Sequence, residues 1–220
     1  MGYTTEFTGK FEINKVMPRE FVEYINRFSS TRRMKRDNDK IKKVHPNWKE
    51  LCFNGNLGVQ GEYLAIKSNK FGQEQEASIV DYNRQPCTQP GLWCQWVIET
   101  NEDLKDETID SFTGSLVWDN GEKFYEYVDW LAYMIKHFFE PSELVLNGIV
   151  LAVGEEVSED ATYILVKDNR IFTQNAHEEN AIEEVINTIG DNSSILAIFE
   201  GIKKTSEEIL DEYGYDEYDD

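Results

Sequence analysis

Hydrophobic and polar residues alternate near the N-terminus of the chain. Phe7, Phe11 and Ile13 fall on one face, and charged or hydroxyl side chains fall on the other. A period of two predicts a half-buried strand over residues 3–13. Pro18 then suits the first position of a helix, because apolar residues recur after it at helical spacing to about residue 33. We therefore expect a strand that leads into an amphipathic helix.

The next part of the chain has weaker periodicity. Residues 34–61 contain Pro46 and several glycines, which indicates an irregular connection with one short helix around Trp48. Aromatic and aliphatic residues are concentrated at 62–67, 91–100 and 114–118, and each of these stretches is expected to be a strand. The residues between the first two, 69–90, are expected to form a long functional or mobile loop.

A continuous apolar stripe from Phe124 to Phe138 gives the clearest helical pattern, and it stops at Pro141. Asp119, Asn120 and Gly121 are expected to make a turn, and Asp119 and Glu122 also have the spacing of a capping box, which places the start of this helix just after them. The stripe predicts the central core helix of the protein.

The C-terminal third begins with β-rich stretches and ends with helical ones. Residues 144–153 and 161–174 are expected to be strands, with a type I′ turn at Asp168 and Asn169 and a bulge at Asn147 and Gly148. Isoleucines at helical spacing then predict two helices, within 182–189 and 195–209, followed by an acidic tail.

This order of elements predicts an α+β fold. We expect a largely antiparallel sheet with two helices packed on one face, for which a ferredoxin-like arrangement is the nearest simple model. A C-terminal helical hairpin is added to it. The expected domains are residues 1–175, the α+β domain, and residues 176–220, the acidic helical hairpin and tail.

The charge of the chain adds information about function that the hydrophobic pattern does not give. The chain has 22 Lys and Arg against 42 Asp and Glu, a net charge of -20. It contains no long hydrophobic run, so we expect neither a membrane span nor a secretory signal peptide. Three cysteines without a CxxC pair argue against a disulfide framework or a structural zinc site. A cytoplasmic setting is the expected one.

The charge is distributed unevenly along the chain. Residues 1–50 carry a net charge of +5, and the remainder carries -25. Most of the positive excess lies in the run from Arg32 to Lys43, whereas residues 206–220 hold eight acids and no base. Such poles can mark interaction surfaces, although solubility explains the same composition. The acidic pole could also imitate the phosphate backbone of DNA.

No catalytic motif is evident. The chain lacks GxSxG, and the glycines at 55, 58 and 61 precede an expected strand, whereas a phosphate-binding loop opens a helix. A Cys–His dyad could be assembled only by the fold. We therefore predict no catalytic residues, no metal ligands and no cofactor, and we leave enzymatic activity open with a binding role favoured.

Several segments resemble a family of uncharacterised proteins found in bacterial and phage genomes. The resemblance rests on residues 90–97 (PGLWCQWV), 118–131 (WDNGEKFYEYVDWL) and 146–148 (LNG), with 31–36 and 81–84 also matching. It covers about residues 2–172, and the C-terminal acidic hairpin lies outside it. The family has no established activity, so the resemblance implies a cytoplasmic, phage or mobile-element setting. It draws attention to eight candidate ligand-binding residues: Arg32, Arg33, Asp81, Asn83, Arg84, Trp93, Glu122 and Lys123.

Two functional hypotheses follow. The first is a non-enzymatic interaction protein that engages a protein partner through its acidic surface or its central loop. The alternative is an enzyme or small-ligand binder whose pocket, near Arg32, Arg84 and Glu122, holds a phosphate or carboxylate. Binding of nucleic acid is expected only through Arg32 to Lys43, since the net charge of -20 repels a polyanion.

Overall fold

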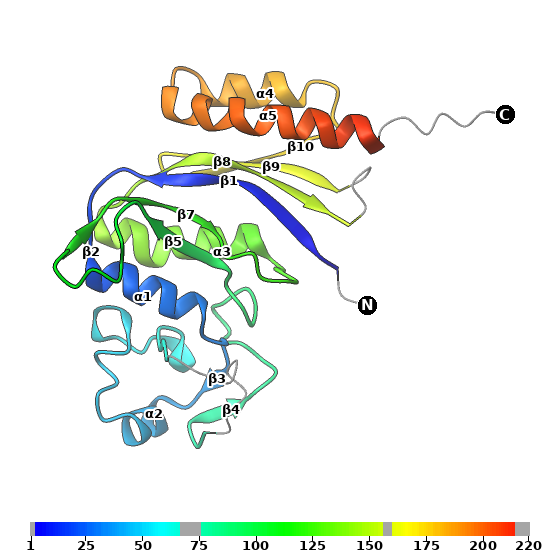
Figure 1. Ribbon diagram of the computed structural model, residues 1–220. Coiled ribbons are helices and arrows are strands. Elements are labelled where there is room, and N and C mark those ends of the chain that lie inside the picture. The colour runs from blue at the N-terminus through cyan, green and yellow to red at the C-terminus, as the bar shows by residue number, and fades with distance from the viewer. Residues whose placement is uncertain (1–2, 67–75, 156–159, 214–220) are drawn as a thin grey trace.

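A six-stranded antiparallel sheet forms the centre of the protein. Figure 1 shows the computed structural model, which describes residues 3–66, 76–155 and 160–213, with residues 204–213 described by their backbone alone. The order of the strands is β10-β9-β8-β1-β7-β5, and every neighbouring pair is antiparallel. The expected α+β class with a largely antiparallel sheet is thus confirmed. The strands are β1 (Thr5–Ile13), β5 (Trp96–Thr100), β7 (Gly114–Trp118), β8 (Leu146–Gly154), β9 (Ala161–Lys167) and β10 (Arg170–Asn175).

Two helices cover one face of the sheet (Figure 1). They are α1 (Arg19–Ser29), which lies between β1 and β5 in the sequence, and α3 (Tyr127–Met134), which lies between β7 and β8. Pro18 occupies the N-cap position of α1, whereas the sequence predicted it at the next position, the first of the helix. The core beneath these helices is rich in aromatic rings, among them Phe11, Phe28, Trp96 and Trp130, all fully buried.

The two remaining long helices cover the opposite face (Figure 1). They are α4 (Ala181–Ile189) and α5 (Ser193–Tyr213). Alternation along β8 sends Val150 toward the first core and Ile149 and Leu151 toward a second core with Phe199 of α5. Burial on both faces explains why β8 is a nearly continuous apolar run. Within the described residues, no helix combines the length and the apolar composition needed to cross a bilayer.

A layer of short elements lies beyond α1, on the side away from the sheet (Figure 1). Its described residues are 31–66 and 76–95, around a small core of Ile41, Cys52, Leu57 and Leu64. Its helix α2 is Asn38–Val44, capped by the Asp37 carboxylate, so the short helix lies before Trp48 and not around it. The strands β3 (Lys35–Arg36) and β4 (Ile79–Asp81) pair within the layer, and β2 (Met17–Pro18) pairs with β6 (Ser111–Phe112) beside α1.

The strand expected at residues 62–67 was wrong. Leu64 makes only an isolated bridge to Cys52, because the carbonyl oxygens of Glu62 and Leu64 accept hydrogen bonds from the Arg33 side chain and not from a neighbouring strand. The strand expected at 91–100 begins only at Trp96. Part of the predicted long loop, residues 69–75, lies outside the described residues.

The start of the core helix was also predicted wrongly. Helix α3 begins at Tyr127 after Glu126, which has a left-handed backbone with a φ of 54°. Asp119 accepts a hydrogen bond from the backbone N–H of Gly121 and therefore closes a turn, not a capping box. Phe124 is buried without being helical. The helix continues through a π-helical turn (Ile135–Phe139) and a 3₁₀ turn (Glu140–Ser142), so the predicted stop near Pro141 is confirmed.

The two turn predictions in the last hairpins had opposite outcomes. Asp168 and Asn169 have φ values of 51° and 63° between β9 and β10, which confirms the type I′ turn. The bulge at Asn147 and Gly148 was wrong, since β8 pairs with β1 without a register shift. A Cβ atom on Gly148 would lie 2.2 Å from the carbonyl oxygen of Lys10. Glycine at position 148 allows the backbones of β1 and β8 to approach each other closely.

Candidate functional site

The Arg32 surface, as we call the group of Arg32, Lys35, Tyr82, Arg84 and Trp93, lies where β3 runs beside the end of β4. Pairing of Lys35 with Asp81 brings the two segments together, and the Lys35 backbone N–H donates to the carbonyl of Arg84 at 2.7 Å. The Arg32 guanidinium lies 4.6 Å from the centre of the Tyr82 ring and 5.9 Å from that of Trp93. Its Nε donates to the carbonyl of Tyr82 at 3.4 Å. These contacts hold a half-exposed cation against two aromatic rings.

The turn that follows β4 presents a second cation. The Asp81 carboxylate accepts a hydrogen bond from the backbone N–H of Asn83, which fixes the turn. Arg84 lies 3.8 Å from Asp81, and its side chain is 80% exposed. An ion pair this exposed contributes about 0–1 kcal/mol, so the Arg84 side chain is held only weakly. The structure thus brings together Arg32, Asp81, Asn83, Arg84 and Trp93 of the predicted set.

Arg33 has a different environment from its neighbour. It is 2% exposed, and its guanidinium lies 4.0 Å from the Phe28 ring centre. It donates to the carbonyl oxygens of Glu62 and Leu64 and to the side chain of Gln89. Burial lowers the pKa of Arg33, although a guanidinium stays charged in proteins. Arg33 therefore joins α1 to the outer layer and is not available to a ligand.

Glu122 and Lys123 belong to the turn before α3. The Glu122 carbonyl accepts a hydrogen bond from the Gln95 side chain, and Lys123 has a left-handed φ of 61°. In the part of the chain that the structure describes, no hydrogen bond or ion pair joins either residue to Arg32 or Arg84. The structure thus gives no contact that links the two groups of predicted residues.

A partly buried ion pair joins Arg36 of β3, next to Lys35 of the Arg32 surface, to Glu76. Arg36 is buried, and its guanidinium donates to the Glu76 carboxylate at 2.8 Å and to the Ser78 hydroxyl at 2.7 Å. The second carboxylate oxygen of Glu76 lies 3.0 Å from Nε2 of His45. Burial alone would raise the pKa of Glu76, but the hydrogen bond from Ser78 and the charge of Arg36 outweigh it, so the pKa lies below its ordinary 4.5.

We expect Glu76→Gln to lower the free energy of unfolding by about 2 kcal/mol at neutral pH, because it leaves the Arg36 cation buried without its carboxylate. A carboxylate whose pKa is lower in the folded state than in the unfolded state stabilises the fold at pH values above the unfolded pKa. That contribution is lost as the pH falls through the folded pKa. The difference between parent and variant should therefore shrink below pH 4.5. Urea unfolding across pH measures it. Asp39→Asn, on an exposed carboxylate paired with Lys42, is the control and should change stability little at any pH.

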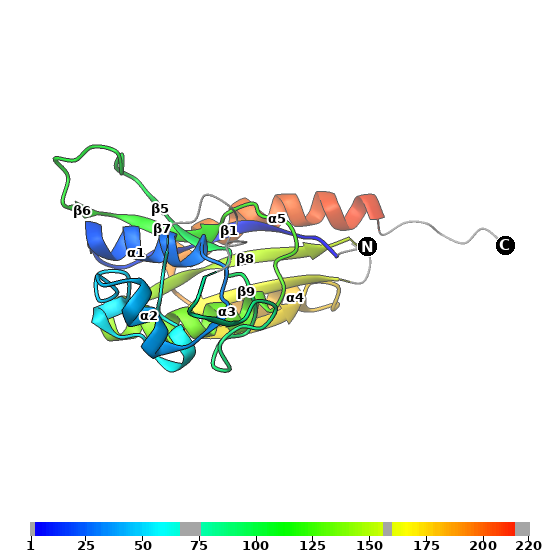
Figure 2. The same cartoon turned by 90° about the horizontal axis from the view of Figure 1, so that it is seen from below.

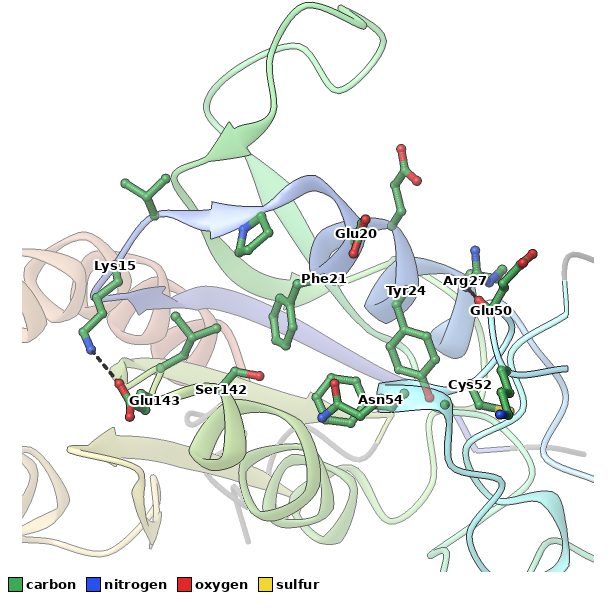
Figure 3. A pocket seen from close by; sticks show the side chains of 17 residues that line it. Lys15, Glu20, Phe21, Tyr24, Arg27, Glu50, Cys52, Asn54, Ser142 and Glu143 are labelled. Atoms are coloured by element: carbon green, nitrogen blue, oxygen red, sulfur yellow. Dashed lines mark hydrogen bonds and ion pairs between the residues drawn. The ribbon is translucent and has the colours of Figure 1, made fainter. Parts of the chain in front are cut away.

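An open groove beside α1 has a volume of about 770 Å³ (Figure 3). Phe21, Tyr24 and Phe53 form its aromatic floor. Charged residues stand at both ends, and the Nε atom of Arg27 is buried without a hydrogen-bond partner. None of the eight predicted residues lines it. The groove is lined by residues of α1 and of the segments around it: Lys15, Val16, Pro18, Glu20, Phe21, Glu23, Tyr24, Arg27, Lys49, Glu50, Cys52, Phe53, Asn54, Gly55, Ser142, Glu143 and Leu144.

Burial keeps two of the thiols and one imidazole in their neutral forms. Burial raises the pKa of Cys52 and of Cys94 to about 12, so both thiols are protonated at neutral pH. Tyr63 lies 2.7 Å from Nδ1 of His137, but burial raises the tyrosine pKa to about 12 and lowers the histidine pKa. Both members of this pair are therefore neutral. Among the described residues, no three His, Cys, Asp or Glu side chains are grouped as they would be around a metal ion.

Sequence reasoning placed Lys35 only in the basic run from Arg32 to Lys43, and it missed Tyr82 at the Arg32 surface and the groove. Tyr82 could have been found, because it lies between Asp81 and Asn83 in a segment that was already singled out. The sequence showed only that Phe21 and Tyr24 recur at helical spacing. That spacing is the same for residues that face the core and for residues that line a groove. Comparison of the chain with known protein families, with curated proteins and with solved structures returned no match.

Proposed function

We propose that this protein is a non-enzymatic interaction protein that binds an acidic segment of a protein partner through the Arg32 surface. The observation that carries the proposal is the Arg32 guanidinium held against Tyr82 and Trp93, with the exposed Arg84 beside it. Arginine and aromatic side chains are enriched among the residues that contribute most to protein interfaces. A positioned guanidinium also binds carboxylates in a bidentate manner.

The local charge supports an acidic partner in spite of the global charge of -20. Arg32, Lys35 and Arg84 outnumber Asp81 at this surface, and exposed charges more than about 10 Å away are largely screened at physiological salt. Long-range repulsion then slows the encounter without preventing short-range pairing. Binding is accordingly expected to require some salt and to weaken at high salt.

Nucleic acid is the less favoured partner. In the basic run from Arg32 to Lys43, Arg33 and Arg36 are buried and bonded to other parts of the chain. They are therefore not available to phosphates. Lys42 and Lys43 are exposed on α2, so the cations of the run are split between two places. A continuous basic surface, which non-specific binding of a phosphate backbone needs, is not formed by this run.

The proposal includes the finer features of the fold. We infer a ferredoxin-like unit from the chain order β1, α1, β5, β7, α3, β8, which is β-α-β-β-α-β, and from β1 and β7 as its two inner strands. The short connection between α4 and α5, residues 190–192, supports a helical hairpin on the other face. A cytoplasmic, phage or mobile-element setting stays part of the same proposal.

A second candidate function is the binding of a small aromatic carboxylate or phosphate in the groove of Figure 3. Its volume of about 770 Å³ is within the range of ligand pockets. The aromatic floor would contact a ring, and the guanidinium of Arg27, which lines the groove, would contact the anion. The predicted small-ligand pocket near Arg32, Arg84 and Glu122 stays a prediction.

We expect Arg32→Ala to weaken binding of Glu-rich peptides at least tenfold, since removing a central arginine of an interface costs more than about 1–2 kcal/mol. The measurement is a fluorescence titration against Glu-rich peptides with and without an aromatic residue, and against Lys-rich peptides of equal length. Lys42→Ala, on an exposed lysine of α2, is the matched control and should bind as the parent does.

Two results would count against this reading. If parent and Arg32→Ala bind Glu-rich peptides equally, the Arg32 surface is not the site. If instead aromatic carboxylates or nucleotides raise the melting temperature and Arg27→Ala abolishes that shift, the groove is the binding site and the second candidate replaces the first.

A further inference from the structure

The two edge strands of the central sheet, β5 and β10, differ in whether other groups bond to their outer backbone. At one edge, the outer side of β5 is covered by side chains of α1. The Asn26 amide donates to the carbonyl of Ile98 at 2.9 Å and accepts from the Ile98 N–H at 2.7 Å. Ser29 donates to the carbonyl of Trp96. These contacts occupy the backbone groups with which another strand would pair, and natural sheets commonly protect their edges in this way.

The other edge, the outer side of β10, lacks such a cover. The two-residue turn makes Lys167 and Arg170 a hydrogen-bonded pair, so the backbone groups of Ile171 and Thr173 point away from β9. Among the described backbone groups, and among the side chains of residues 3–66, 76–155 and 160–203, none outside the β9–β10 ladder makes a hydrogen bond with the backbone of Ile171 or Thr173. Within that part of the chain, four backbone groups in a row therefore lack a hydrogen-bond partner.

A large apolar side chain stands in the middle of this edge. Phe172 is 43% exposed, although it points to the same face as Leu165, its neighbour on β9, which is buried under α4 and α5. An exposed phenylalanine on an open edge strand is the opposite of the usual protection by charge, proline or a bulge. The edge thus combines unpaired backbone with an apolar contact.

We propose that β10 pairs antiparallel with β10 of a second copy of this chain, with Phe172 at the two-fold axis. In that register Ile171 of each copy lies opposite Thr173 of the other, which allows four backbone hydrogen bonds. The two Phe172 rings face each other as a non-hydrogen-bonded pair, the type in which side chains come closest. The two sheets join into one.

Complementarity of the strand to itself identifies a second copy as the occupant. The same register places Arg170 opposite Gln174 of the other copy. The Gln174 amide donates to the Glu178 carboxylate at 2.6 Å, so each Arg170 faces an acidic group. The contact between Arg170 of one copy and Glu178 of the other would occur twice, once on each side of the two-fold axis. Such a two-fold interface is isologous and closes as a dimer.

The dimer is expected to be weak and to respond to salt. Its interface is small, and each copy carries a charge of -20, so association must overcome mutual repulsion. A dissociation constant on the order of 10⁻⁵ to 10⁻⁴ M is expected at physiological salt. Moderate salt should strengthen the dimer, because it screens the repulsion over the whole surface more than it weakens the short-range contacts.

Sedimentation equilibrium of the full chain tests the proposal. The parent should show a monomer–dimer equilibrium, and Phe172→Lys or Thr173→Pro should lower its association constant at least about tenfold. The proline removes an outward N–H at an edge position where proline is tolerated. Val80→Lys replaces another exposed apolar residue, on β4, and should dimerise as the parent does. Unchanged thermal unfolding excludes misfolding as the cause.

Cross-linking tests the register directly. Phe172→Cys, combined with Cys87→Ser to remove the exposed native thiol, should form a disulfide dimer under mild oxidation. Directly opposed residues of a non-hydrogen-bonded pair have the Cα separation that a disulfide needs. Gln174→Cys in the same background should not cross-link. A monomer at all concentrations, a Phe172→Lys variant that dimerises normally, or equal cross-linking of both cysteine variants would overturn the proposal, whatever the outcome at the Arg32 surface.

Discussion

Arg33→Ala is expected to lower the free energy of unfolding by about 4 kcal/mol, the largest effect of any substitution considered for this protein. Arg33 is almost completely buried, and its hydrogen bonds go mainly to backbone carbonyls of residues that have no strand partner. Without the guanidinium, the buried carbonyl of Leu64 loses its hydrogen bond, at a cost of about 1–3 kcal/mol, and the carbonyl of Glu62 keeps only its bond from the Gln89 amide. The alanine also leaves a cavity beside Phe28.

Removal of a buried charge offsets part of this loss, and a second variant separates the two effects. Arg33→Met fills most of the space and avoids the cost of burying a cation, but it still removes the hydrogen bonds to the carbonyls of Glu62 and Leu64, so a loss of about 2 kcal/mol is expected. Urea unfolding followed by circular dichroism gives both values. Arg84→Ala, on an arginine whose side chain is 80% exposed, should stay within about 0.5 kcal/mol of the parent. If Arg33→Ala behaved like Arg84→Ala, Arg33 would have no structural role.

Gly148→Ala is expected to destabilise the protein by about 3 kcal/mol, through overpacking in the centre of the sheet. The new Cβ atom would lie 2.2 Å from the carbonyl oxygen of Lys10 and 2.7 Å from the Cα of Phe11. Both are backbone atoms of β1, the strand paired with β8, so neither can move without opening the ladder. Relief of the clash requires β1 and β8 to separate locally.

Gly201→Ala is the matched control for this prediction. Gly201 lies in α5, and a Cβ atom there would meet no atom within 4 Å. Alanine has a higher helix propensity than glycine by about 1 kcal/mol, so this variant should be slightly more stable than the parent. Thermal unfolding of both variants checks the pair. A Gly148→Ala protein as stable as Gly201→Ala would contradict the close packing of β1 against β8.

Local pattern was sufficient for the elements whose neighbours in space are also neighbours in sequence. The hairpin of β9 and β10, with Asp168 and Asn169 in its turn, depends on residues only a few positions apart. The amphipathic stripe of α1 and the alternation in β1 follow from burial of one face, whatever that face meets. These predictions were therefore correct within a few residues.

Segments whose backbone is satisfied by distant side chains were predicted wrongly. The stretch around Leu64 has the composition of a strand, but Arg33, about thirty residues earlier in the chain, takes its carbonyl groups. The bulge expected at Gly148 follows a general preference of glycine, whereas the actual cause is the approach of β1 from the other end of the chain. Neither partner is visible in a local window of sequence.

The candidate site also combines features that the sequence predicted with features that only the packing of the chain decided. Arg32 and Arg33 are adjacent and chemically identical in the sequence, and both were singled out. Packing makes them different, because the end of α1 turns one guanidinium toward Tyr82 and Trp93 and the other into the interior beside Phe28. Residue type and periodicity give the chemistry that is available and the face each element will bury. Which arginine meets a partner depends on contacts between segments far apart in the chain, and those are set only when the layers pack.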